Sequence, residues 1–371
     1  MHPKRMGFDR SCLSGWHEGP RYYAPHIRVD GVPRPELAEQ YGPDVYTQFL
    51  MNFMEDAGDR PFLAFYSMAL CHDVTDDLAE PVPYGLKGRY DSYPEVVRAM
   101  DRQVGRLLSF LEDRGMRENT AIFFCSDNGT AGRTIVSADG GQYTREENVS
   151  VRNGALVPGE KGSLTDGGTR VPFFVSWPGA IRRGQVTDAL TDLSDIFPTL
   201  VALAGETPCQ EPPLDGESLL PGLLGQGEFA RSWLFAEAQG RCWVRTQRWK
   251  RYADGSYYDA VLDPEEAVPL DPSNLQGEGK AAFVALGEVL DILRPPGCGI
   301  QGNPITESGR KRSRNPGHWQ VPARETHRER QVRPVPVQRG PSVGFSPGRL
   351  PSAARRARVM NSYSGTQSRL A

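Results

Sequence analysis

Residues 121–129 read Ala-Ile-Phe-Phe-Cys-Ser-Asp-Asn-Gly, an apolar run followed directly by a carboxylate and an amide. The run predicts a short strand, and Asp127 and Asn128 follow where that strand would end. Carboxylate and amide oxygens are ligands for hard metal ions such as calcium and magnesium. Because Asp, Asn and Gly are also common turn formers, a plain turn is the competing interpretation.

The sequence before this strand predicts a helix. Ser92 is followed three residues later by Glu95, with a proline between them, which is the pattern of a capping box. Apolar residues then recur at helical spacing, at Val97, Met100, Val104, Leu107, Leu108 and Leu111. The helix should end near Gly115. Helix, turn and strand then form half of an α/β crossover, with Asp127 and Asn128 at the strand end where open α/β sheets usually carry their sites.

A second block, residues 161–172, reads K-G-S-L-T-D-G-G-T-R-V-P. It resembles the K-x-x-x-x-[ED]-G-G-x-R-V-P block of the sulfatase family, within the alkaline phosphatase superfamily. Residues 124–129 resemble that family's second metal-ligand segment. Other segments are similar in the same order: 6–9, 61–67 with His72, 195–200, 214–219, 249–252, 258–259 and 263–266. The resemblance covers about residues 1–294.

The resemblance implies an α/β fold, with an alkaline phosphatase/sulfatase-like mixed sheet flanked by helices. We expect residues 1–225 to form this domain without its amino-terminal part, and residues 226–294 to form a small carboxyl-terminal α+β domain. Residues 301–371 hold 14 basic and 3 acidic side chains and eight prolines, against 29 basic and 43 acidic in residues 1–300. Such a composition predicts a disordered basic tail over 295–371, either a polyanion-binding arm or sequence beyond the family's natural end.

The family also implies roles for individual side chains. Asp127 and Asn128 would bind a divalent metal, with calcium preferred over magnesium. Lys161 would contact a sulfate oxygen, and His72 would donate a hydrogen bond to the sulfate. A solvated loop lysine is the alternative for Lys161, and an exposed acidic loop is the alternative at His72, where the family's following proline is missing. Arg170 and the neighbouring glycine pair are expected to be structural.

The family's nucleophile is a formylglycine made from the first residue of a C-x-P-S-R motif or its serine variant. None of the six cysteines fits that motif, and no serine before the tail fits it either. The family's first aspartate pair and G-K-W-H block are also missing. We therefore nominate no nucleophile, and we expect this chain to be an amino-terminally truncated member.

The first function hypothesis is a sulfuric ester hydrolase of the arylsulfatase type, acting on a small-molecule or carbohydrate sulfate ester. A catalytically inactive sulfatase fragment or anion-binding module is one alternative, and a phosphodiester or phosphonate hydrolase of the same superfamily is another. No nucleic-acid partner is expected. No membrane partner is expected either, because the longest apolar stretch, residues 62–70, is too short to span a bilayer. The start carries no signal-peptide core, so the sequence as written predicts a cytoplasmic location, although family members are commonly exported. The oligomeric state is left open.

Overall fold

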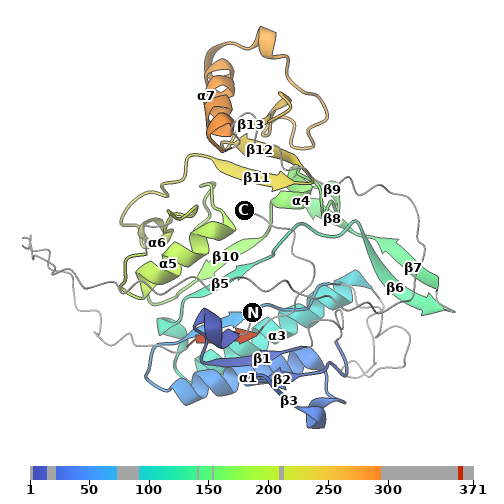
Figure 1. Ribbon diagram of the computed structural model, residues 1–371, viewed down its shortest axis with the longest axis vertical. Coiled ribbons are helices and arrows are strands. Elements are labelled where there is room, and N and C mark those ends of the chain that lie inside the picture. Colours follow the sequence, from blue (N-terminus) through green and yellow to red (C-terminus); the bar gives the residue numbers. More distant parts are fainter. Residues whose placement is uncertain are drawn as a thin grey trace, which may run out of the picture. The chain divides into compact units, whose positions relative to one another are not determined.

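The computed structural model describes residues 3–14, 22–72, 92–139, 142–152, 154–208, 213–293 and 358–361. They form an α/β body and a small antiparallel sheet with its own helix (Figure 1). The helices are α1 Gly42–Ala57, α3 Tyr93–Asp113, α4 Asp166–Thr169, α5 Ile196–Leu203, α6 Leu220–Leu223 and α7 Gly277–Leu293, with 3-10 turns at Pro3–Met6, Pro35–Leu37, Arg117–Asn119, Leu193–Asp195 and Pro272–Asn274. The strands are β1 Arg10–Leu13, β2 Arg28–Val29, β3 Val32–Pro33, β4 Leu63–Tyr66, β5 Ile122–Cys125, β6 Arg133–Asp139, β7 Gln142–Glu147, β8 Val149–Arg152, β9 Ala155–Pro158, β10 Phe173–Ser176, β11 Leu234–Ala238, β12 Arg241–Arg245, β13 Trp249–Tyr252, β14 Tyr257–Asp259 and β15 Arg358–Asn361.

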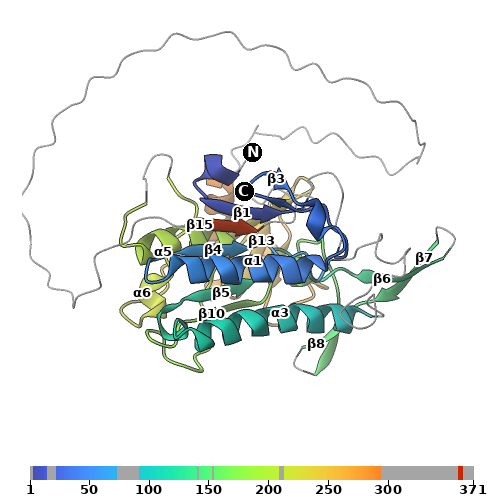
Figure 2. The same ribbon diagram turned by 90° about the horizontal axis from the view of Figure 1, so that it is seen from below.

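Helix α3 confirms the helix predicted from apolar spacing, and it lies beside α1 (Figure 2). It ends before Gly115, whose φ of 65° is in the left-handed region that favours glycine. The predicted capping box is not formed, because the Ser92 side chain makes no cap hydrogen bond. The Ser92 carbonyl instead accepts the main-chain N–H groups of Glu95 at 3.1 Å and Val96 at 3.3 Å. The main chain therefore turns into the helix without a side-chain cap.

Helices α1 and α3 share one hydrophobic core with strands β4 and β5. Leu50 and Phe53 of α1 and Leu111 of α3 are buried there, and Ala64 of β4 and Ile122 of β5 pack against them. Strand β5 confirms the predicted strand and pairs antiparallel with β10. The core thus fixes β5, and with it the residues that follow its carboxyl end.

Strand β15 lies between β1 and β4 and runs parallel to both. Residues 358–361 belong to the segment 295–371, over which the sequence predicts a disordered tail. Their main chain pairs with β1 on one side and with β4 on the other. The other tail residues lie outside the described part of the chain.

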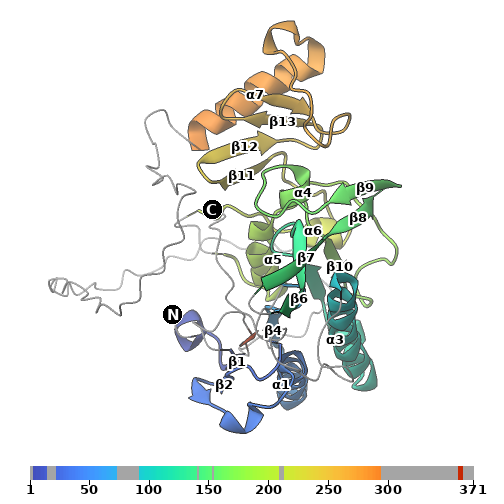
Figure 3. The same ribbon diagram turned by 90° about the vertical axis from the view of Figure 1, so that its right-hand side faces the viewer.

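The small sheet has the order β11-β12-β13-β14, with all neighbours antiparallel, and α7 packs on β12 and β13 (Figure 1). Its core includes Trp249, Tyr257 and Leu286. The Trp249 and Tyr257 rings stack with centroids 5.6 Å apart, and the Tyr257 hydroxyl donates to the Gly279 carbonyl at 2.8 Å. These contacts join the small sheet to α7, which lies over β12 and β13 (Figure 3).

Two segments that resemble the end of the family's main domain are joined directly. Asp195 is fully buried and accepts the Glu217 N–H at 2.8 Å, and it pairs with the guanidinium of Arg231. Thr199 accepts the Leu219 N–H at 2.8 Å through its hydroxyl.

None of the described helices combines the length and the apolar character needed to cross a bilayer.

Asp259 makes the stability of the small sheet depend on pH. Burial raises the pKa of this carboxyl, but the Arg248 guanidinium and the N–H groups of Leu262 and Val261 outweigh it and hold the pKa below its usual range. A carboxyl with a depressed pKa stabilises the fold above its unfolded pKa of about 3.9, and this stabilisation is lost as pH falls through the folded pKa. We expect Asp259→Asn to lower the urea midpoint at pH 7, with a much smaller loss at pH 3. An equal loss at both pH values would contradict this account.

Candidate functional site

Asp127 and Asn128 stand directly after β5, as the sequence predicted. The Ser126 hydroxyl donates to the Asn128 carbonyl at 2.8 Å and closes the turn. The Asn128 amide nitrogen donates to an Asp127 carboxylate oxygen at 2.7 Å, so the two side chains lie together. That bond uses the amide nitrogen, and the Asn128 amide oxygen and the second Asp127 oxygen remain as hard-metal ligands. Asp127 is exposed and Asn128 is half-buried.

The lysine loop, residues 160–170, is hydrogen-bonded to this turn. The main-chain N–H of Lys161 donates to the Thr130 carbonyl at 2.9 Å, and the N–H of Gly129 donates to the Gly168 carbonyl at 2.9 Å. The structure therefore brings together the two segments that the sequence analysis singled out separately. The side chain of Lys161 is exposed, so it is not fixed by packing of its own.

Glycines make this close approach possible. A Cβ on Gly129 would lie 2.0 Å from the Gly167 carbonyl oxygen, and a Cβ on Gly168 would lie 2.2 Å from the Ser163 carbonyl oxygen. Both distances are shorter than any real contact of a Cβ. The predicted structural role of the glycine pair is consistent with this geometry. Arg170 is exposed and lies 4.0 Å from the Asp166 carboxylate, a weak helical pair that also suits a structural role.

His72 follows β4 and is exposed. Its main-chain N–H donates to the Ala69 carbonyl at 2.9 Å, and its carbonyl accepts the Tyr22 hydroxyl. These bonds fix the backbone at His72 and do not assign its imidazole to the lysine loop. The role of His72 stays a prediction.

The fit of the site to a divalent ion is partial. Asp127 and Asn128 supply oxygen donors of the right chemistry, but calcium takes six to eight oxygen ligands. In the part of the chain that the structure describes, no group of three or more His, Cys, Asp or Glu side chains is arranged to hold a metal. The two residues therefore make up only a fraction of a complete coordination shell.

Three described cysteines, Cys12, Cys71 and Cys125, do not supply an activated thiolate. Burial raises the pKa of Cys12 to about 12 and that of Cys71 to about 11. Burial, followed by the charge of Asp127, also raises the pKa of Cys125. These thiols are protonated at neutral pH, and a protonated thiol is a poor nucleophile.

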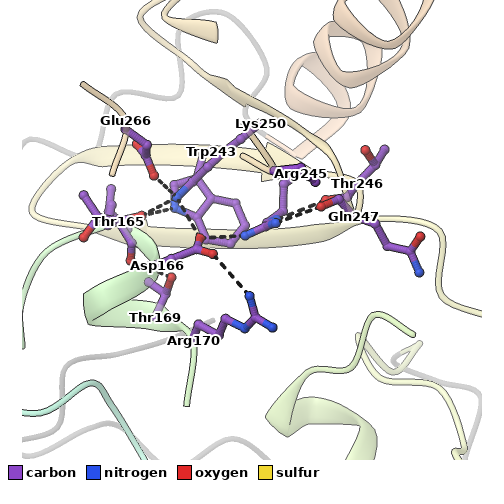
Figure 4. Close-up of polar contacts among 12 residues, drawn as sticks. Thr165, Asp166, Thr169, Arg170, Trp243, Arg245, Thr246, Gln247, Lys250 and Glu266 are labelled. Carbon is purple, nitrogen blue, oxygen red and sulfur yellow. Dashed lines mark hydrogen bonds and ion pairs between the residues drawn. The ribbon is translucent and has the colours of Figure 1, made fainter. Parts of the chain in front are cut away.

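Sequence reasoning missed a buried polar cluster behind the lysine loop (Figure 4). The Leu164 carbonyl accepts the Trp243 indole N–H at 2.7 Å and the Lys250 ammonium at 2.8 Å, and the Tyr252 hydroxyl lies 3.3 Å from it. Asp166 accepts the Arg245 guanidinium at 2.6 Å. We call these six residues the loop anchor. The one available signal was the strand 249–252, Trp-Lys-Arg-Tyr, in which Lys250 and Tyr252 lie on the same face because side chains alternate along a strand.

Comparison with known proteins identifies the family. The sulfatase family profile matches residues 2–206. The chain belongs to the sulfatase family. The chain is 30% identical over 291 residues to the N-acetylgalactosamine-6-sulfatase of Canis lupus familiaris, in a match that covers 69% of this chain and 51% of the relative. It is also 30% identical over 293 residues to the steryl-sulfatase of Mus musculus, which covers 76% of this chain and 44% of the relative.

Solved structures share the fold of this chain. The crystal structure of Ps i-CgsB has a TM-score of 0.60 at 21% identity, over 79% of this chain and 67% of that chain. BT4656, solved in complex with its substrate D-glucosamine-2-N,6-O-disulfate, has a TM-score of 0.53 at 18% identity, over 78% of this chain and 80% of that one. The sulfatase chain spans about half the length of the curated relatives it matches.

Proposed function

We propose that this protein is a sulfuric ester hydrolase of the arylsulfatase type, and that this chain carries metal-binding and sulfate-binding residues of its site. The observation that carries the proposal is the pair of main-chain hydrogen bonds between the turn at Asp127 and the lysine loop. Those bonds hold two oxygen ligands and a lysine on adjoining segments. An enzyme that cleaves a sulfate ester needs both a metal and a cation to stabilise the charge on the sulfuryl oxygens.

Each residue would have a separate role. Asp127 and Asn128 would hold calcium, or alternatively magnesium, through a carboxylate and an amide oxygen. When bound, that ion supplies charge stabilisation for the sulfuryl group. Lys161 would place a point charge on a sulfate oxygen, and His72 would donate a hydrogen bond to the sulfate. The family's formylglycine has no precursor motif in this sequence, so no nucleophile is assigned.

A sulfate ester of a carbohydrate or small molecule is the proposed substrate class. Two of the similar proteins are named for sulfated amino sugars, an N-acetylgalactosamine-6-sulfatase and a protein bound to a glucosamine disulfate. The site in this chain selects for the sulfate group itself. The carbon skeleton is not specified by the side chains that carry the proposal.

Sulfate binding tests the proposal directly. In calcium-containing buffer, we expect inorganic sulfate to bind weakly, with Lys161→Ala weakening it about tenfold, the loss of one charge-assisted hydrogen bond. Asp127→Ala should reduce calcium binding, which we expect to be weaker than about 1 mM for two protein ligands. Calorimetry measures both, and Lys280→Ala, which alters an exposed lysine on α7, is the matched control. If Lys161→Ala and Lys280→Ala bind sulfate equally, Lys161 is not a sulfate contact.

An anion-binding module without catalysis is the second candidate, favoured by the missing nucleophile motif. It predicts that this chain does not hydrolyse 4-nitrophenyl sulfate above a buffer blank, even where sulfate binds. Release of 4-nitrophenol is followed by absorbance. Hydrolysis that disappears in the Asp127→Ala variant would exclude this second candidate and would show that the site is complete.

A further inference from the structure

The Leu164 carbonyl is the centre of the loop anchor. A carbonyl oxygen has two lone pairs, and two buried donors reach this one, the Trp243 indole N–H from β12 and the Lys250 ammonium from β13. The Tyr252 hydroxyl lies 3.3 Å from the same oxygen and donates to Glu266 at 2.5 Å. Leu164 is 8% exposed, and Trp243 and Lys250 are 3% and 0% exposed. Figure 4 shows Trp243 and Lys250 reaching the loop from the side of the small sheet. A buried acceptor with this many donors is held firmly in place.

A second attachment follows two residues later. Asp166 begins α4, and its carboxylate accepts Arg245 at 2.6 Å and lies 3.7 Å from the Lys250 ammonium. Lys250 also pairs with Glu266 and lies over the Trp243 ring, 4.6 Å from its centroid. The small sheet thus binds the lysine loop at residues 164 and 166. The turn at residues 127–130 is hydrogen-bonded to the loop at residues 161 and 168.

Lys161 depends on these attachments because its side chain is exposed and has no packing of its own. The next residue is Gly162, with a φ of 92° and no atom within 4 Å of its Cβ position. Two residues separate Lys161 from the anchored carbonyl. The position of the ammonium is therefore set by the main chain of the loop, which is held by the turn at 161 and 168 and by the small sheet at 164 and 166.

We propose that Trp243, Lys250 and Tyr252 are positioning residues for Lys161, so that the small carboxyl-terminal sheet sets the geometry of the sulfate contact. This inference rests on the proposed function for the role of Lys161. The anchoring itself does not depend on it. In the unanchored loop, Lys161 keeps its charge but loses its fixed position.

Two mild variants test the proposal. Trp243→Phe removes the indole donor and keeps an aromatic ring beside Lys250, and Tyr252→Phe removes only a hydroxyl. Tyr258→Phe is the matched control, since Tyr258 stacks edge-on against Tyr252 and has no hydrogen bond to the loop among the described residues. Amide hydrogen exchange of the peptide 159–170 is measured by mass spectrometry, together with sulfate affinity by calorimetry.

We expect exchange in the loop peptide to rise several-fold to tenfold in Trp243→Phe, less in Tyr252→Phe and not in Tyr258→Phe. Peptides from α1 and α3 should exchange as in the wild type. Sulfate affinity should fall several-fold in Trp243→Phe, in parallel with loop exchange. Lys161→Ala should lose sulfate affinity without any rise in loop exchange.

Unchanged loop exchange in Trp243→Phe would overturn the proposal, and so would a rise shared equally by all peptides. Faster loop exchange with wild-type sulfate affinity would overturn the positioning role. If wild-type sulfate binding does not depend on Lys161 while the loop still loosens, the proposed function fails and the anchoring stands.

Discussion

Replacing Lys250 by methionine is expected to lower the free energy of unfolding by about 3–5 kcal/mol, the cost of breaking a buried ion pair by removing one partner. The Lys250 side chain is fully buried and pairs with Glu266, whose side chain is 7% exposed. Methionine fills a similar volume but leaves the Glu266 carboxylate and the Leu164 carbonyl without their ammonium donor. Urea unfolding followed by circular dichroism measures the change.

Two further variants isolate the cause. Lys280→Met alters an exposed lysine on α7 and should shift the free energy by less than about 0.5 kcal/mol. Adding Glu266→Gln to Lys250→Met removes the unpaired charge and should recover part of the loss, a coupling that a double-mutant cycle measures. If Lys250→Met is no more destabilising than Lys280→Met, the buried ammonium does not hold the anchor together.

The sequence predicted the parts of this site that depend on local pattern. An apolar run followed by Asp127 and Asn128 is enough to place both residues at a strand end, because strand and turn formation depend on near neighbours. The lysine block placed Lys161 through a motif of fixed spacing. The hydrogen bonds that join the two segments follow from glycines at the points of contact.

The loop anchor could not be predicted in the same way. A lysine is rarely buried, and Lys250 is buried only because Glu266, Asp166 and the Leu164 carbonyl converge on it from distant parts of the chain. Such contacts are set by tertiary structure and leave little trace in local sequence.

Gly129→Ala is the second large effect that we expect. The added methyl would lie 2.0 Å from the Gly167 carbonyl oxygen and 2.8 Å from the Gly168 Cα. Both are main-chain atoms of the lysine loop and cannot rotate away, so the turn and the loop must separate and the bond from the Gly129 N–H to Gly168 is lost. We expect a loss of about 3 kcal/mol in the free energy of unfolding, the upper end of the cost of overpacking.

Gly105→Ala is the matched control, and it should act in the opposite direction. Gly105 lies inside α3 with nothing within 4 Å of its Cβ position. Alanine there should stabilise the protein by about 0.5–1 kcal/mol, the difference in helix propensity. Urea midpoints of the two variants, measured beside the wild type, give both signs in one experiment.

Because Gly129→Ala separates Asp127 from the lysine loop, its sulfate affinity should also fall, whereas Gly105→Ala should bind sulfate as the wild type does. Equal stability of the two alanine variants would mean that the turn and the loop are not in contact.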